Sequence, residues 1–195
     1  VLRDGNPHAV YAMSSTLRIP IINAGNGIDE HPTQAMADLY TIFKWRPSLA
    51  TPSVSASDRI RIGIVGLPSR MRTVRSLLRI LAKFPAAVEE VVIIHDADLI
   101  NSSISVFDPD QLEELVKAGL NIRVSTDLHR EIPELDVIYI NAISWVGDTY
   151  EMHGQGFRLT REMPYKPEAI VLHPLARGPE LCTSLDDSPH NWYFS

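Results

Sequence analysis

The 195-residue sequence predicts an α/β fold, a three-layer and doubly wound parallel sheet. From residue 58 onwards, segments typical of strands alternate with segments typical of helices. Some strand segments, such as EEVVIIHD and AIVLHPL, are apolar over consecutive positions, as strands buried on both faces are in parallel sheets. The apolar content of 45% suffices for one full core and part of a second.

The part of the chain before residue 58 predicts two short strands and two helices. VLR is typical of the end of a buried strand, PHAVYAMSSTL has apolar residues at helical spacing, and IPIINAG is a strand that closes in a turn. PTQAMADLYTIFKWR predicts an amphipathic helix, because Ala35, Leu39 and Ile42 fall on one face. Residues 46–58 contain Pro and Ser without periodicity, which predicts a surface loop.

The remaining elements follow in order along the chain. The expected strands are RIRIGIVG, EEVVIIHD, NIRVST, LDVIYIN and AIVLHPL, and the expected helices are MRTVRSLLRILAKF, DPDQLEELVKAG and LHREI, with a long irregular loop at 145–168. Ligands of such sheets bind beyond the carboxyl ends of the strands. The polar segments to consider there are Gly66–Arg72, His95–Asp98, Asn141–Asp148 and His173–Arg177.

Composition excludes several classes of function. The net charge of −6 without a basic block argues against a nucleic-acid partner. No apolar run approaches the ~20 residues that span a bilayer, so no membrane partner is expected. A single cysteine, Cys182, excludes an internal disulfide and suits the cytoplasm. The histidines lack metal-ligand spacing, so we expect no metal and no cofactor.

Both ends of the chain read as cut. The sequence opens with Val inside an apolar segment, and it closes with three aromatic residues in HNWYFS. We therefore expect a fragment of a longer protein.

The stretch INAGNGIDEHPTQAMADLYTIF, residues 22–43, places polar groups at the mouth of a helix after a glycine turn. Pro32 suits the first helical turn, where its missing N–H costs nothing. His31 and Gln34 can converge just outside the helix N-terminus, where an imidazole donor and an amide suit a small carbonyl-amide ligand. The alternative is a structural cap with a surface histidine.

Two further motifs follow strands. GIVGLPSRMRTVRSLL lacks the third glycine of a dinucleotide-binding turn and carries arginines there, so a small anion fits better than NAD, with Arg72 at the turn and Arg75 and Arg79 on a solvated helix face. VLHPLARG is a buried strand that ends in His-Pro-Leu, where backbone carbonyls can accept from an amine. Alone, a histidine such as His173 is more often a packed core or edge histidine than a catalyst.

Together, INAGNGIDEHPTQAMADLYTI, VGLPSRMRTVRSL and LHPLARGPELCTSLDDSPHNWYF resemble the aspartate/ornithine carbamoyltransferase family, closest to its aspartate branch. The resemblance runs from VLRDGNPHAV to the last residue. It implies transfer of a carbamoyl group from carbamoyl phosphate to the amine of an amino acid, with orientation and oxyanion stabilisation as the source of catalysis. It also implies a homotrimer or larger assembly, because family active sites borrow a loop from a neighbouring subunit.

The resemblance assigns roles to residues of the carbamoyl site. It implies that Arg3 contacts the phosphate and the carbonyl oxygen, that His31 donates to the carbonyl oxygen, and that Gln34 holds the carbamoyl amide.

The resemblance also assigns the acceptor site. It implies that Arg72 holds the α-carboxylate and that backbone oxygens of Pro174 and Leu175 receive the amine. Arg177 takes a supporting role through ion pairs.

The resemblance divides the chain into three parts. Residues 1–32 match the tail of the carbamoyl-phosphate-binding domain, 33–46 the linking helix, and 58–195 the amino-acid-binding α/β domain. The family's Ser-x-Arg-Thr-Arg segment has no match, so this chain alone is expected to be inactive. A catalytically inactive binding or assembly subunit is the alternative.

Two departures concern the acceptor. The Arg and Gln that read aspartate in the family are Ala142 and Ser144 here, within an expected specificity loop at 141–153. Aspartate is therefore expected to be a poor acceptor, and a different amino acid is the alternative. Trp145 either fills the side-chain pocket or packs the loop. The family's Leu-Pro, usually a cis bond, is Leu175–Ala176, so either a cis bond persists or the carbonyls point elsewhere.

Overall fold

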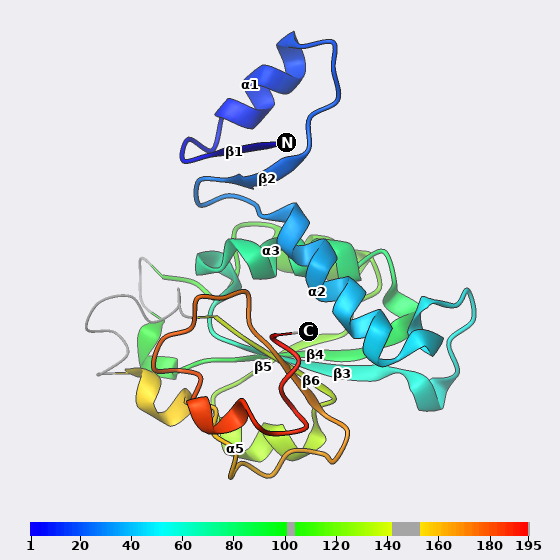
Figure 1. Ribbon diagram of the computed structural model, residues 1–195, viewed down its shortest axis with the longest axis vertical. Helices are drawn as coiled ribbons and strands as arrows, with labels where there is room; N and C mark the ends of the chain where they lie inside the picture. The colour runs from blue at the N-terminus through cyan, green and yellow to red at the C-terminus, as the bar shows by residue number, and fades with distance from the viewer. Residues whose placement is uncertain (101–103, 142–152, 195) are drawn as a thin grey trace.

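The computed structural model describes residues 1–100, 104–141 and 153–194 (Figure 1). Its helices are α1 (Ala9–Thr16), α2 (Pro32–Trp45), α3 (Arg72–Leu81), α4 (Gln111–Lys117) and α5 (Leu128–Glu131). Its strands are β1 (Leu2–Asp4), β2 (Asn23–Asn26), β3 (Ile60–Val65), β4 (Val88–Ile94), β5 (Ile122–Ser125), β6 (Val137–Ile140) and β7 (Ile170–Leu172).

Five of these strands form one parallel sheet in the order β5-β4-β3-β6-β7. From β3 the chain moves outward through β4 to β5, then returns to the other side of β3 for β6 and β7. The direction of winding therefore reverses between β3 and β6, which is where doubly wound sheets bind ligands. The predicted parallel α/β sheet is confirmed.

Apolar layers cover both faces of the sheet. Figure 1 shows α2 and α3 on one side and α5 on the other. On α3, Val74, Leu77, Leu78 and Leu81 recur at helical spacing and are almost fully buried against the first face. The second face is covered by α5 and by the C-terminal segment, which inserts Leu159, Leu181 and Leu185. These layers account for the predicted three-layer architecture.

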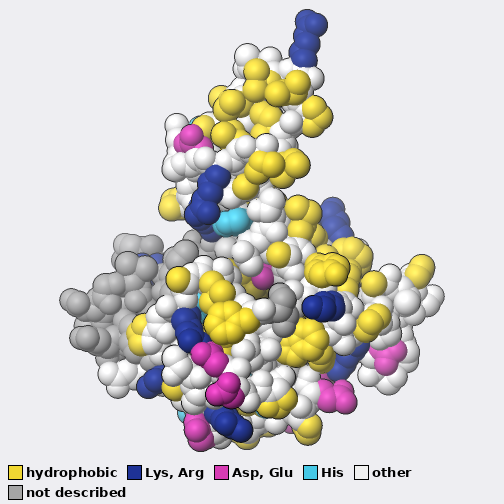
Figure 2. Space-filling model, viewed as in Figure 1, with side chains coloured by type: hydrophobic (Ala, Val, Ile, Leu, Met, Phe, Trp, Pro, Cys, Tyr) yellow, Lys and Arg dark blue, Asp and Glu magenta, His cyan; other side chains and the backbone are white. Residues whose placement is uncertain are grey.

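The N-terminal segment projects from the sheet as a small arm (Figure 1). In it, β1 pairs in parallel with β2, and α1 packs beside them with Val10 as its buried residue. Apolar side chains cover much of the arm's surface in Figure 2. The large apolar side chains that are exposed there are Val1, Tyr11, Met13, Leu17, Ile19, Ile22 and Ile28. The arm thus buries little apolar surface of its own.

The segment at 46–58 differs from the expected surface loop. It contains 3₁₀ turns at Pro47–Ala50 and Ala56–Asp58. Leu49 is only 1% exposed, because it packs into the core beneath α2 and α3. Within the ranges described, no helix has the length and hydropathy needed to cross a bilayer.

Candidate active site

A cleft of about 350 Å³ opens at the carboxyl edge of the sheet, beside the point where the winding reverses. Its walls come from the arm, the start of α2, the start of α3, and the segments that follow β6 and β7. The lining residues are Arg3, His31, Gln34, Arg72, Thr73, Asn141, Pro174, Leu175 and Ala176. Three motifs far apart in sequence therefore meet at one place.

One polar segment at this edge lies outside the cleft. His95–Asp98 follows β4, on the far side of β3 from the reversal point, and it is absent from the residues that line the cleft. His95 is buried with its Nδ1 2.8 Å from the Asp96 carbonyl oxygen, and the Asp96 carboxylate lies 3.0 Å from Nδ1 of His153.

His31 is the N-cap of α2, and Pro32 occupies the first helical turn. Nδ1 of His31 accepts a hydrogen bond from the backbone N–H of Gln34 at 3.3 Å. Its own backbone N–H donates to Oγ of Ser76 on α3 at 2.9 Å. Burial, followed by the nearby charges of Arg72 and Arg3, lowers the pKa of His31. The imidazole is therefore a neutral group that carries its proton on Nε2.

Arg72 lies at the first position of α3, directly after the turn that follows β3. Its Nη1 donates to the carbonyl oxygen of Gly27 in the arm. Burial, followed by the charge of Arg3, lowers the pKa of Arg72, although an arginine keeps its charge. The guanidinium groups of Arg3 and Arg72 thus both line the cleft, and such groups suit phosphate or carboxylate oxygens.

Gly25 lies in the glycine turn next to both His31 and Arg72. Its φ is +118°, a conformation that residues with a Cβ rarely adopt. A Cβ at this position would lie 3.6 Å from Nε2 of His31 and 3.5 Å from Nη1 of Arg72. The glycine turn therefore brings backbone close to both polar groups.

Gln34 faces the cleft on one side and a buried carboxylate on the other. Its Nε2 donates to Oδ1 of Asp38 at 2.9 Å, one helical turn further along α2. The second oxygen of Asp38 accepts from the hydroxyl of Tyr139 on β6 at 3.0 Å. Asp38 is not among the site residues predicted from the sequence, although its i, i+4 spacing from Gln34 was a usable signal.

The opposite wall is the turn after β7. Nδ1 of His173 accepts from the backbone N–H of Leu175 at 2.9 Å, and its Nε2 lies 3.0 Å from Oε1 of Glu180. Both side chains of this pair are 1% exposed. The peptide bond between Leu175 and Ala176 is cis, which settles the alternative that the sequence left open.

Arg177 lies outside the set of residues that line the cleft. Its Nη2 donates to the Asp186 carboxylate at 2.8 Å, and the hydroxyl of Tyr193 donates to the same carboxylate at 2.7 Å. This position fits the supporting role expected from the sequence. Ala142, Ser144 and Trp145 lie outside the described residues.

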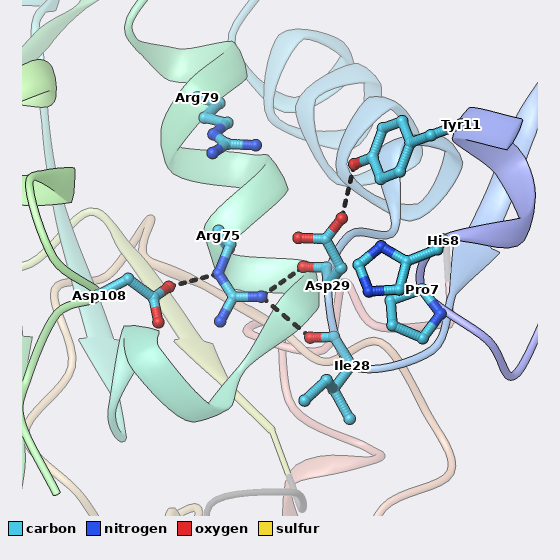
Figure 3. A pocket seen from close by; sticks show the side chains of 8 residues that line it. All are labelled: Pro7, His8, Tyr11, Ile28, Asp29, Arg75, Arg79 and Asp108. Atoms are coloured by element: carbon cyan, nitrogen blue, oxygen red, sulfur yellow. Dashed lines mark hydrogen bonds and ion pairs between the residues drawn. The ribbon is translucent and has the colours of Figure 1, made fainter. Parts of the chain in front are cut away.

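Arg75 differs from the expected solvated helix face. Its side chain is only 12% exposed and lies at the joint between the arm and α3 (Figure 3). Its Nε donates to Asp108 at 2.6 Å, and its Nη1 donates to the carbonyl oxygens of Ile28 and Asp29. Arg79 is 56% exposed and pairs with Glu30. These arginines therefore hold the turn that leads into His31.

Comparison with known families decides the wider assignment. Residues 58–195 match the Asp/Orn-binding domain of aspartate/ornithine carbamoyltransferase, and residues 1–44 match its carbamoyl-P-binding domain. The chain belongs to the aspartate/ornithine carbamoyltransferase family.

Curated carbamoyltransferase relatives show how much of the length is shared. The aspartate carbamoyltransferase catalytic subunit of Ignicoccus hospitalis is 35% identical over 98% of this chain and 58% of its own length. That of Vibrio campbellii is 34% identical over 90% of this chain and 53% of its own length. The chain thus spans a little over half the length of the curated relatives it matches.

Solved carbamoyltransferase structures agree with the fold. Aspartate transcarbamoylase from Trypanosoma cruzi, in complex with aspartate and phosphate, superposes with a TM-score of 0.78 and 29% identity, over 98% of this chain and 57% of that one. The same enzyme in complex with N-(phosphonacetyl)-L-aspartic acid gives a TM-score of 0.77.

Proposed function

We propose that the protein transfers a carbamoyl group from carbamoyl phosphate to the α-amine of an amino acid, with aspartate as the leading acceptor. The observation that supports this is the meeting of His31, Gln34, Arg72 and the Pro174–Ala176 turn in one cleft of a carbamoyltransferase-family chain. The named relatives, all aspartate carbamoyltransferases, support aspartate as the acceptor.

The carbamoyl group would lie between the start of α2 and the arm. Nε2 of His31 donates to the carbonyl oxygen and stabilises it as the tetrahedral oxyanion forms, which is worth ~10²–10³ in rate for a single donor. Oε1 of Gln34 accepts from the carbamoyl NH₂ group, and Arg3 contacts the phosphate. The acceptor nitrogen attacks the carbonyl carbon, a C–N bond forms, and the C–O bond to phosphate breaks. The proton lost by the nitrogen passes to the departing phosphate, which leaves as hydrogen phosphate. No covalent enzyme intermediate is needed.

The amino acid would occupy the other half of the cleft. Arg72 binds its α-carboxylate, in competition with the Gly27 carbonyl oxygen that its Nη1 now contacts. Backbone oxygens at Pro174 and Leu175 accept from the amine and orient its lone pair toward the carbamoyl carbon.

A second candidate is transfer to a different amino acid. Ala142 and Ser144 carry no charge, so neither can pair with the β-carboxylate of aspartate. Trp145, three residues after Ala142 in the sequence, has an apolar ring that would suit a different acceptor side chain.

We further propose the domain division and the assembly. Residues 1–32 form the tail of the carbamoyl-phosphate-binding domain, 33–46 link it to the amino-acid-binding domain, and 58–195 form the latter. The separate family matches at 1–44 and 58–195 support this division. In this proposal the complete protein is at least a trimer, and the chain alone does not turn over carbamoyl phosphate. Sedimentation of the complete gene product as a monomer at micromolar concentration contradicts the trimer.

The deciding experiment assays the complete gene product with ¹⁴C-carbamoyl phosphate and a panel of amino acids. We expect labelled N-carbamoyl-aspartate, with the highest kcat/KM for aspartate. Preference for another amino acid supports the second candidate instead. If the protein binds carbamoyl phosphate but forms no product with any amine, it is a binding or assembly subunit and the proposed function is wrong.

A further inference from the structure

A hydrogen-bonded chain runs beneath the cleft from α2 to the end of β6. It begins at Nε2 of Gln34, passes through both carboxylate oxygens of Asp38, and reaches the hydroxyl of Tyr139. Asp38 is 6% exposed and Tyr139 is fully buried. A carboxylate in such a place needs partners for its charge, and these two donors supply them.

The hydrogen-bonded chain from Gln34 to Tyr139 has a direction, because an ionised carboxylate only accepts hydrogen bonds. Facing Asp38, the Gln34 amide must present its NH₂ end, and its carbonyl oxygen is then the end that remains for the cleft. An acceptor at this position favours a ligand with an N–H group, because an isosteric methyl group cannot donate a hydrogen bond to it.

We propose that Asp38 is a positioning residue that fixes the Gln34 amide with its oxygen toward the cleft, and so selects the NH₂ group of the carbamoyl donor. This inference rests on the proposed function for the identity of the ligand. The orientation of the amide stands on the contacts themselves.

The charge on Asp38 makes this orientation dependent on pH. Burial raises the pKa of Asp38 to about 6, against the hydrogen bonds from Gln34 and Tyr139 and the nearby His173, which lower it. His173 belongs to β7's carboxyl end and is itself paired with Glu180. Below about pH 6 the carboxyl group gains a proton and can donate, so the amide loses its fixed direction.

The substitution Asp38→Asn separates positioning from simple loss of a contact. If the Tyr139 hydroxyl keeps its acceptor, it takes the oxygen of the introduced amide, and the NH₂ end of that amide then faces Gln34. Gln34 turns its own oxygen inward and presents a donor to the cleft. Tyr139→Phe is the matched control, because it also removes a hydrogen bond from Asp38 but leaves an ionised carboxylate facing Gln34.

The test compares carbamoyl phosphate with acetyl phosphate, which has a methyl group in place of NH₂. With the complete gene product at pH 8, we measure the KM for carbamoyl phosphate and the Ki of acetyl phosphate. Asp38→Asn is expected to reduce the preference for the carbamoyl compound by about tenfold or more, and Tyr139→Phe to keep most of it. Equal effects of the two variants indicate a structural role and overturn the inference.

A second measurement does not depend on turnover. The side-chain NH₂ signals of Gln34 in ¹H–¹⁵N spectra are followed from pH 4.5 to 8. We expect an inflection near pH 6 in the wild type and none in Asp38→Asn. Gln34 NH₂ signals in the wild type that match those of Asp38→Asn over the whole range overturn the inference even in an active enzyme. A wild type that forms no carbamoyl product with any amine, but shows the inflection, overturns the proposed function and keeps the positioning role.

Discussion

His31 and Gln34 are joined at the mouth of α2 by a bond from the Gln34 backbone N–H to Nδ1 of the His31 ring. This one contact caps the helix and fixes the tautomer of the imidazole, since a nitrogen that accepts cannot carry the proton. Nε2 is therefore a donor, and the lowered pKa of His31 keeps the ring neutral at pH 7. His31 is thus both the helix cap and the candidate hydrogen-bond donor to the carbonyl oxygen.

His31→Ala is expected to lower kcat for carbamoyl transfer by about 10²–10³-fold, the usual loss for one oxyanion donor. Steady-state kinetics of the complete gene product measures it. His8→Ala is the control, because His8 is exposed and its side chain does not cap α1. Wild-type kcat in the His31 variant contradicts the assigned role.

Gly25→Ala is expected to destabilise the protein by about 1–3 kcal/mol, because its φ of +118° is strained for any residue with a Cβ. The added carbon would touch His31 and Arg72 only at ordinary van der Waals distance, so binding of N-(phosphonacetyl)-L-aspartic acid should weaken only as far as the strained turn shifts these two groups. Urea unfolding and calorimetric titration measure the two effects. Gly156→Ala is the control, since nothing lies within 4 Å of its Cβ position. Equal losses of stability in the two variants count against the positive φ of Gly25 as the cause.

The sequence predicted the sheet well because its signals are local. The runs at β6 and β7 are apolar at every position, and those at β3 and β4 at most positions, as burial between two layers requires. The start of α2 was placed within one residue, since Pro32 and the preceding cap define a helix N-terminus without help from distant residues.

Long-range partners explain what the sequence did not show. Arg75 falls on the polar face of α3 by periodicity, but its acceptors come from the arm and from Asp108, and only the fold brings them together. Leu49 gave no periodic signal in a Pro-rich segment, yet its side chain is buried in the core. His95–Asp98 ends a strand like the site segments do, and only the strand order excludes it.

Arg75→Lys is expected to destabilise the protein by about 2–3 kcal/mol, because one ammonium group cannot reach the Asp108 carboxylate and both arm carbonyl oxygens that the guanidinium contacts in Figure 3. Chemical denaturation measures the loss. Arg130→Lys, at an exposed position on α5, serves as the control and should change stability by less than about 0.5 kcal/mol. If the two variants have the same stability, Arg75 does not hold the arm.

Glu180→Ala is expected to lower the free energy of unfolding by about 3–5 kcal/mol, because it leaves the buried His173 ring and the Gly178 N–H without their acceptor. Glu180→Gln keeps an oxygen for both donors and should cost less.

The pH dependence of the Glu180 contribution follows from its pKa. Burial alone would raise that pKa, but the hydrogen bonds from His173 and the backbone outweigh burial and lower it below the ordinary value of 4.5. A lowered carboxyl pKa stabilises the fold above pH 4.5, and the contribution is lost as the pH falls through the folded-state pKa. Urea unfolding is measured at pH 7 and at pH 4. The free energies of unfolding of wild type and Glu180→Gln should therefore differ less at pH 4 than at pH 7. A difference that grows on acidification means that the carboxylate is not held in its charged form, and that the turn at Pro174 and Leu175 is fixed by other contacts.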